Sequence, residues 1–155
     1  MFLPLLFVIL LAALAADGRA QNVDIRSITS AVNMAVTSGS FNLSTGAASV
    51  TSSSAISSQI RSRLRPWTLD VRALSSTFSH SPASGAPLTA KPVSDLLIRQ
   101  NGTSAFAAIS TSNMVVASGA ATSSTNVNLD LRFDTSLSDS PGNYAATLVL
   151  TIITL

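Results

Sequence analysis

The chain has 155 residues, of which 46% are hydrophobic and only 10% are charged, and it contains no Cys and no Glu. Small hydroxyl groups are abundant, with 27 Ser and 15 Thr, whereas Lys occurs once. This composition excludes a disulfide scaffold, a zinc ribbon, a coiled coil and a charged disordered tail. It also argues against a helical protein, because the surface helix formers Glu and Lys are nearly missing.

The N-terminus has the features of a targeting segment. Residues 2–16 form an apolar run, and the small residues Gly18 and Ala20 follow it. The run is shorter than the roughly 20 residues that a membrane-spanning helix needs, and its flanking small residues are typical of a secretory signal peptide. We therefore predict a signal peptide over residues 1–20 and a secreted, extracellular or cell-surface protein, which includes a periplasmic location. An uncleaved membrane anchor is the alternative.

The chain after this segment carries little charge. Residues 21–155 contain seven Arg and one Lys against six Asp, a dispersed net charge of +2 that does not indicate a nucleic-acid partner. Three arginines cluster, at Arg61, Arg63 and Arg65. They are expected either in a solvated loop or strand edge, or in contact with a phosphate or a cell-wall polymer.

Alternating apolar and polar residues predict strands in the C-terminal half. The pattern is uninterrupted over residues 126–133, and residues 67–74 repeat it. Alternation places the apolar side chains on one face, as in an antiparallel sheet with one solvated side. Residues 95–100 and 112–117 are also predicted strands. Residues 143–155 form a last strand that is apolar on both faces, which indicates a central position or a covering partner.

Turn signals separate these strands. Asn101-Gly102 predicts a hairpin between residues 95–100 and 104–109, with positive φ at both turn residues. The proline-containing residues 75–92 are expected to form a loop over one end of the fold.

The N-terminal half has a fainter pattern. It suggests strands at residues 23–27, 31–36 and 40–43, whereas residues 48–60 are either a weak strand or a long loop. In total, the chain is predicted to be all-β, with about eight or nine short strands forming one antiparallel, immunoglobulin-like β-sandwich over residues 21–155.

No catalytic constellation is evident. The single histidine, His80, lies in a Ser/Pro/Gly-rich segment without a nucleophile elbow, and the chain has no Glu. The pairs Asp70/Arg72 and Asp130/Arg132 are expected to make cross-strand ion pairs on a wet face. We predict no catalytic residue, no metal site and no cofactor, hence a protein that is not an enzyme.

The segment from about Pro66 onward resembles the WxL domain of bacterial surface proteins. The resemblance rests on Trp67-Thr68-Leu69 at the start of a strand, a Pro/Gly-containing loop, and a closing turn and strand over residues 141–148. One difference is that the last strand, residues 147–155, lacks the Trp of the family's second motif. The resemblance implies a small, secreted, β-rich fold that associates non-covalently with peptidoglycan. Trp67 also has a structural interpretation, as a large apolar anchor of a sandwich core.

Two functions follow as hypotheses. The first is a secreted, non-enzymatic surface protein that binds a cell-envelope polymer, peptidoglycan or polysaccharide, or other surface proteins. Its candidate ligand-binding residues are Trp67, Leu69, Arg61, Arg63 and Arg65. The second is a pilin-like structural subunit that forms homo-oligomers by strand exchange. Its candidate assembly residues are Val23, Ile25, Val149, Ile153 and Leu155.

Overall fold

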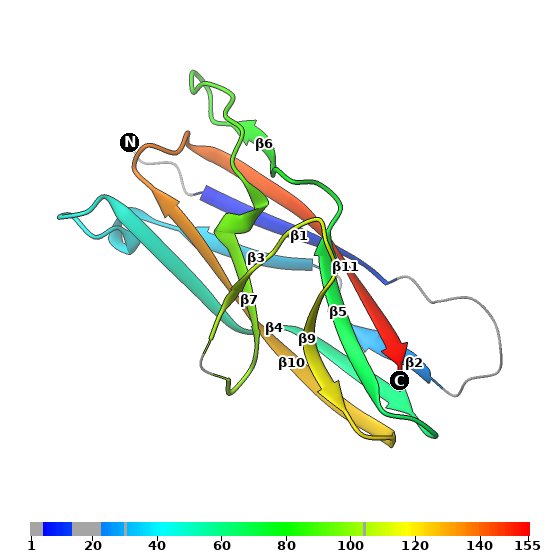
Figure 1. The fold of residues 1–155 in the computed structure, drawn as a ribbon. Helices are drawn as coiled ribbons and strands as arrows, with labels where there is room; N and C mark the ends of the chain where they lie inside the picture. Colours follow the sequence, from blue (N-terminus) through cyan, green and yellow to red (C-terminus); the bar gives the residue numbers. More distant parts are fainter. Residues whose placement is uncertain (1–4, 14–22, 30, 104) are drawn as a thin grey trace.

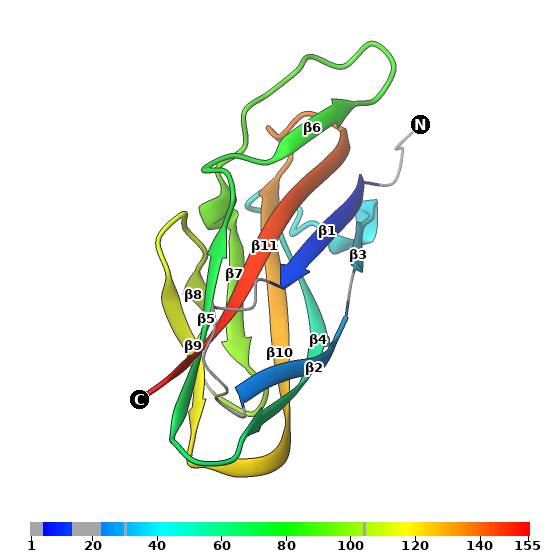
Figure 2. The ribbon, with the colours of Figure 1, turned by 90° about the vertical axis from the view of Figure 1, so that its right-hand side faces the viewer.

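The fold is an all-β sandwich, as predicted. A computed structural model describes residues 5–13, 23–29, 31–103 and 105–155, and it describes residues 5–13 and Ser27 by their backbone alone. Two β-sheets stack face to face around one hydrophobic core (Figures 1 and 2). The described residues contain no α-helix, and their only helical segments are the short 3₁₀ turns η1 (Ser38–Ser40) and η2 (Val93–Asp95).

The first sheet, called sheet A here, has the strand order β3-β1-β11-β5-β9, and β6 pairs with the start of β11. Its strands are β1 (Leu5–Ala13), β3 (Ala31–Val36), β5 (Trp67–Ala73), β6 (Ser79–Pro82), β9 (Met114–Gly119) and β11 (Gly142–Thr154). All of its described ladders are antiparallel except that of β1 with β11, which is parallel.

The second sheet, sheet B, is antiparallel throughout its described strands, in the order β2-β4-β10-β7-β8. Its strands are β2 (Val23–Ile28), β4 (Ala47–Ser62), β7 (Leu96–Gln100), β8 (Ala107–Ala108) and β10 (Thr122–Ser136). The region that was expected to be a weak strand or a loop is the long strand β4. Its inward side chains Ile56 and Ile60 are fully buried, which explains why a Ser-rich segment stays in the sheet.

The alternating patterns predicted the core. Val127, Leu129, Leu131 and Phe133 of β10 are all buried, and so are the inward residues of β5 that begin with Trp67. Each fully buried large apolar side chain contributes roughly 1.5–3 kcal/mol relative to an exposed one. These two strands therefore supply much of the interface between the sheets.

The predicted hairpin after β7 exists but has a different turn. Gly102 has a positive φ of 84°, whereas Asn101 does not have positive φ, and the Thr103 N–H donates to the Gln100 carbonyl at 3.1 Å. Glycine at the third of four residues fits a type II turn, in which only that residue needs positive φ. The returning strand is reduced to β8. The predicted loop over residues 75–92 also contains a short strand, β6, that pairs with β11.

The predicted pairing of Asp130 with Arg132 on a wet face is wrong. Asp130 is 1% exposed and accepts hydrogen bonds from Arg99 Nε at 2.9 Å, Asn101 Nδ2 at 2.8 Å and the Ser54 N–H at 2.9 Å. Burial opposes the charged carboxylate, but these hydrogen bonds outweigh it and hold the pKa of Asp130 below its usual value.

Two of the three other members of the predicted pairs are also placed differently. Arg132 pairs instead with Asp134 of its own strand, at 3.0 Å. Asp70 is buried and forms no ion pair with any described residue, so its predicted pairing with Arg72 is wrong as well.

Candidate functional site

Strand β1 occupies an internal position in sheet A, between β3 and β11 (Figure 1). Residues 5–10 face residues 31–36 of β3 in an antiparallel ladder, and residues 7–13 face residues 144–150 of β11 in a parallel one. The segment reads LLFVILLAA, and an uninterrupted apolar sequence is typical of a strand that lies inside a sheet.

Strand β3 depends on β1 for its place in sheet A. Within the described chain, β1 is the only ladder partner of β3, whereas the opposite edge of β11 is occupied by β6 and β5. Without β1, the facing edges of β3 and β11 would present unpaired backbone N–H and C=O groups. We call the space between these two edges the β1 groove.

The β1 groove coincides with the predicted signal peptide. Cleavage after Ala20 would remove β1 from the mature chain. Neither this cleavage nor the alternative of a membrane anchor is tested by the fold, and both stay predictions. In the part of the chain that the structure describes, no helix has the length and apolarity needed to cross a bilayer.

The start of β11 is fixed by buried hydrogen bonds that do not involve β1. The Tyr144 hydroxyl donates to the Ser140 carbonyl at 2.7 Å, and the Ser140 hydroxyl donates to the Pro87 carbonyl at 2.6 Å. His80 of β6 stacks on the Tyr144 ring, with 4.2 Å between centroids. Its Nδ1 accepts the Thr89 N–H at 3.2 Å. This end of β11 is therefore held by residues 80–89.

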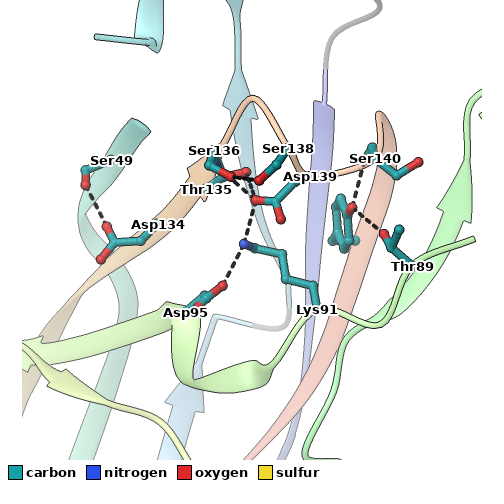
Figure 3. A network of polar contacts seen from close by, with 11 residues as sticks. Ser49, Thr89, Lys91, Asp95, Asp134, Thr135, Ser136, Ser138, Asp139 and Ser140 are labelled. Carbon is teal, nitrogen blue, oxygen red and sulfur yellow. Dashed lines mark hydrogen bonds and ion pairs between the residues drawn. The ribbon is translucent and has the colours of Figure 1, made fainter. Parts of the chain in front are cut away.

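A buried ion-pair network holds the adjoining turn between β10 and β11. Lys91 Nζ lies 2.6 Å from Asp95 Oδ2 and 2.8 Å from Asp139 Oδ2, and the Lys91 side chain is only 5% exposed (Figure 3). Asp139 also accepts hydrogen bonds from the Thr135 hydroxyl at 2.6 Å and the Ser136 N–H at 2.9 Å. The network joins the segment before β7 to the turn before β11.

The charges of this network stabilise one another. Burial opposes the charged form of Lys91, but its hydrogen bonds with Asp139 and Asp95 outweigh that effect and raise the pKa of Lys91. Burial likewise opposes the Asp139 carboxylate, but hydrogen bonds from Lys91, Thr135 and Ser136 hold the pKa of Asp139 below its usual value. The network is thus a structural clamp, because each charge has its partner.

A small cavity lies beside one end of the β1 groove. Its volume is about 160 Å³, and its apolar lining includes Val36 at the end of β3, Phe41, Leu137 and Pro141, which directly precedes β11. Sequence reasoning did not find these residues, because they come from segments far apart in the chain.

The predicted ligand-binding residues do not share one surface. Trp67 is 3% exposed and Leu69 is fully buried, so the structural interpretation of Trp67 as a core anchor is confirmed. Arg61 lies beside Asp24, with 3.6 Å between Nε and Oδ1, and Arg63 and Arg65 are exposed between β4 and β5. Binding of an envelope polymer by these residues stays a prediction.

The predicted assembly residues divide into two groups. Val23 and Ile25 are half-buried on β2, at the edge of sheet B, where they pair with Ser62 and Ile60 of β4. The other three residues lie at the C-terminal end of the chain. Val149 is buried, whereas Ile153 and Leu155 are exposed.

The comparisons with known proteins assign no relative. No protein-family model matches the chain, and no curated protein matches it. The resemblance to WxL domains therefore stays a prediction.

Proposed function

We propose that the protein is an exported, non-enzymatic structural subunit whose mature form lacks one internal strand and is completed by a strand of a second copy. The observation that carries this proposal is the position of β1. The segment predicted to be removed on export is an internal strand of sheet A.

The groove that remains after cleavage would favour a replacement strand. Each buried backbone N–H or C=O group without a partner costs roughly 1–3 kcal/mol. An extended segment inserted between β3 and β11 pairs with both edges at once and offers alternate side chains to the core. The clamp around Lys91 and the Tyr144 hydrogen bonds would keep β11 in position, because these contacts are made by residues outside β1.

The mature N-terminal segment, residues 21–28, suits the role of the inserted strand. Val23 and Ile25 alternate with Asp24 and Arg26, so one face is apolar for the core and the other is charged for solvent. In the isolated chain residues 23–28 of this segment form the edge strand β2, which has a register shift between Ile25 and Ser27. An irregular edge ladder is easier to release than a central one.

Three chains test the proposal, namely residues 1–155, 21–155 and 29–155, compared by light scattering after size exclusion and by urea unfolding. We expect residues 1–155 to be monomeric and residues 21–155 to form oligomers. Residues 29–155 lack both the leader and the inserted strand and should stay monomeric. Their unfolding free energy should be lower than that of residues 1–155 by about 3 kcal/mol or more.

Matched variants of residues 21–155 identify the inserted strand. Ile25→Asp places a charge on its apolar face and should abolish the oligomers, whereas Arg26→Ala on the other face should leave them intact. Circular dichroism checks that both variants are folded. A monomeric 21–155 chain as stable as the full chain would refute the proposal, as would oligomers that Ile25→Asp leaves unchanged.

A further inference from the structure

The indole N–H of Trp67 is a buried donor without an acceptor. The residue is 3% exposed, and Nε1 has no hydrogen-bond partner within the described structure. Buried indole N–H groups usually find an acceptor, so an unpaired one points to a partner that is absent from the isolated chain.

A cavity of about 270 Å³ adjoins this residue at the end of the sandwich where β5 begins and β9 leads into β10. Its lining includes Trp67, Gln100, Ser118, Gly119, Thr125 and Asn126. The lining comes from β5, β7, β9 and β10, so both sheets contribute to it. This cavity shares no lining residue with the one beside the β1 groove.

Gly119 faces the N–H edge of the indole. A Cβ atom added at Gly119 would lie 2.6 Å from Cζ2 and 2.9 Å from Nε1 of Trp67, closer than a side chain can approach. The glycine therefore lets the backbone pack close to the N–H edge of the indole, beside the cavity that both residues line.

The chemistry of the lining selects an uncharged, hydroxyl-rich ligand. Gln100 and Asn126 offer carboxamides, Ser118 and Thr125 offer hydroxyls, and none of the described residues that line the cavity is charged. Carboxamides and hydroxyls both donate and accept, which matches the hydroxyl groups of a sugar, and the indole N–H supplies one further donor. The volume lies just below the range of drug-sized ligand pockets and suits one sugar ring.

We propose that this cavity binds one residue of a neutral carbohydrate, with a sugar oxygen accepting the Trp67 N–H. The proposal is independent of strand exchange, because it uses neither β1, β3 nor the start of β11. It places the recognition site at the start of β5 rather than on the exposed arginines Arg63 and Arg65.

Trp67 is the single tryptophan of the chain, so the intrinsic fluorescence of the full chain reports on this cavity alone. The probe is the neutral tetramer of N-acetylglucosamine, and the negatively charged tetramer of galacturonic acid is the comparison. We expect a saturable change in emission with the neutral probe and at least tenfold weaker binding of the charged one.

Two variants assign the binding to the cavity. Gln100→Ala and Asn126→Ala each remove a carboxamide from the lining and should weaken binding about fivefold, as expected for the loss of one hydrogen bond. Ser123→Ala, an exposed hydroxyl of β10 outside the lining, is the matched control and should bind as the unaltered chain does.

Three results would overturn the proposal. The first is an emission that does not saturate with the neutral probe up to about 10 mM, beyond the range of a specific site. The second is equal binding by the two carboxamide variants and the Ser123→Ala control. The third is unchanged calorimetric binding by Trp67→Phe, which keeps an aromatic ring but lacks the N–H.

Discussion

The centres of the two sheets are built from different kinds of segment. In sheet B the central ladder joins two long strands, the Ser-rich β4 and β10, whose outer face carries mainly Asn, Asp and Arg. In sheet A, β11 pairs on one side with β1, an entirely apolar segment with the features of a leader. Sheet B is therefore complete without residues 1–20, whereas sheet A is not. The difference indicates that any assembly through strand insertion involves sheet A.

Matched core truncations would test this contrast most strongly. Leu131→Ala in β10 and Leu148→Ala in β11 each remove a fully buried side chain, and each should lower the unfolding free energy of the full chain by about 3 kcal/mol. In residues 21–155 carrying Ile25→Asp, which should keep that chain monomeric, Leu131→Ala should keep its effect. Leu148→Ala should cost about 1 kcal/mol less in this chain than in the full chain, because the edge of β11 that holds Leu148 has already lost its partner β1. Equal losses in both chains would contradict the contrast.

The clamp that positions β11 gives the next largest effect. Lys91→Met keeps much of the side-chain volume but leaves Asp95 and Asp139 without their cation, so the unfolding free energy should fall by about 2 kcal/mol in urea titrations. The value is below that of a fully buried pair, because both carboxylates retain some solvent exposure. A neutral effect would show that the network does not hold the turn.

A single hydroxyl tests the other anchor of β11. Tyr144→Phe removes the donor to the Ser140 carbonyl and the contact with the Thr89 hydroxyl, and it should cost about 1–2 kcal/mol, since the ring packing remains. Thermal unfolding followed by circular dichroism measures the effect. Ser138→Ala, which removes an exposed hydroxyl from the same turn, serves as the control and should change little.

The pH dependence of stability tests two carboxylates, Asp130 in β10 of sheet B and Asp139 in the turn that leads into β11 of sheet A. The pKa values of Asp139 and Asp130 are lowered in the folded state, so both carboxylates stabilise the fold above a pH of about 4, and this contribution is lost as the pH falls through the lowered values. Lys91 has a raised pKa, so its contribution is lost only at strongly basic pH. Asp139→Asn and Asp130→Asn should each make the acid decline of unfolding free energy shallower. An unaltered decline in either variant would contradict the assigned hydrogen bonds.

The smallest effect is expected at the exposed arginines. Arg63→Ala and Arg65→Ala lie outside both sheets and should change the unfolding free energy by less than about 0.5 kcal/mol in either chain form. A larger loss would show that the connection between β4 and β5 has a structural role. Chemical denaturation at neutral pH is sufficient for this comparison.

Local patterns predicted a large part of the fold. Alternation identified β5 and β10 and their buried faces, because a strand places every second side chain on one side regardless of its partners. Single residues were predicted less well where their surroundings decide their role. The burial of Asp130 depends on Arg99 and Asn101 of a neighbouring segment, and β4 looked weak because its sparse apolar residues gain their effect only from burial.

By itself, the amino-acid sequence determined the fold class, the apolar character of residues 5–13 and the faces of the strongest strands, because these properties depend on neighbouring residues. Only the tertiary structure decided that residues 5–13 lie between β3 and β11, that Lys91 joins Asp95 to Asp139, and that Trp67 lines a cavity. Each of these relations joins segments that are distant in the chain, and such pairings depend on which edges and side chains the folded sheets bring together.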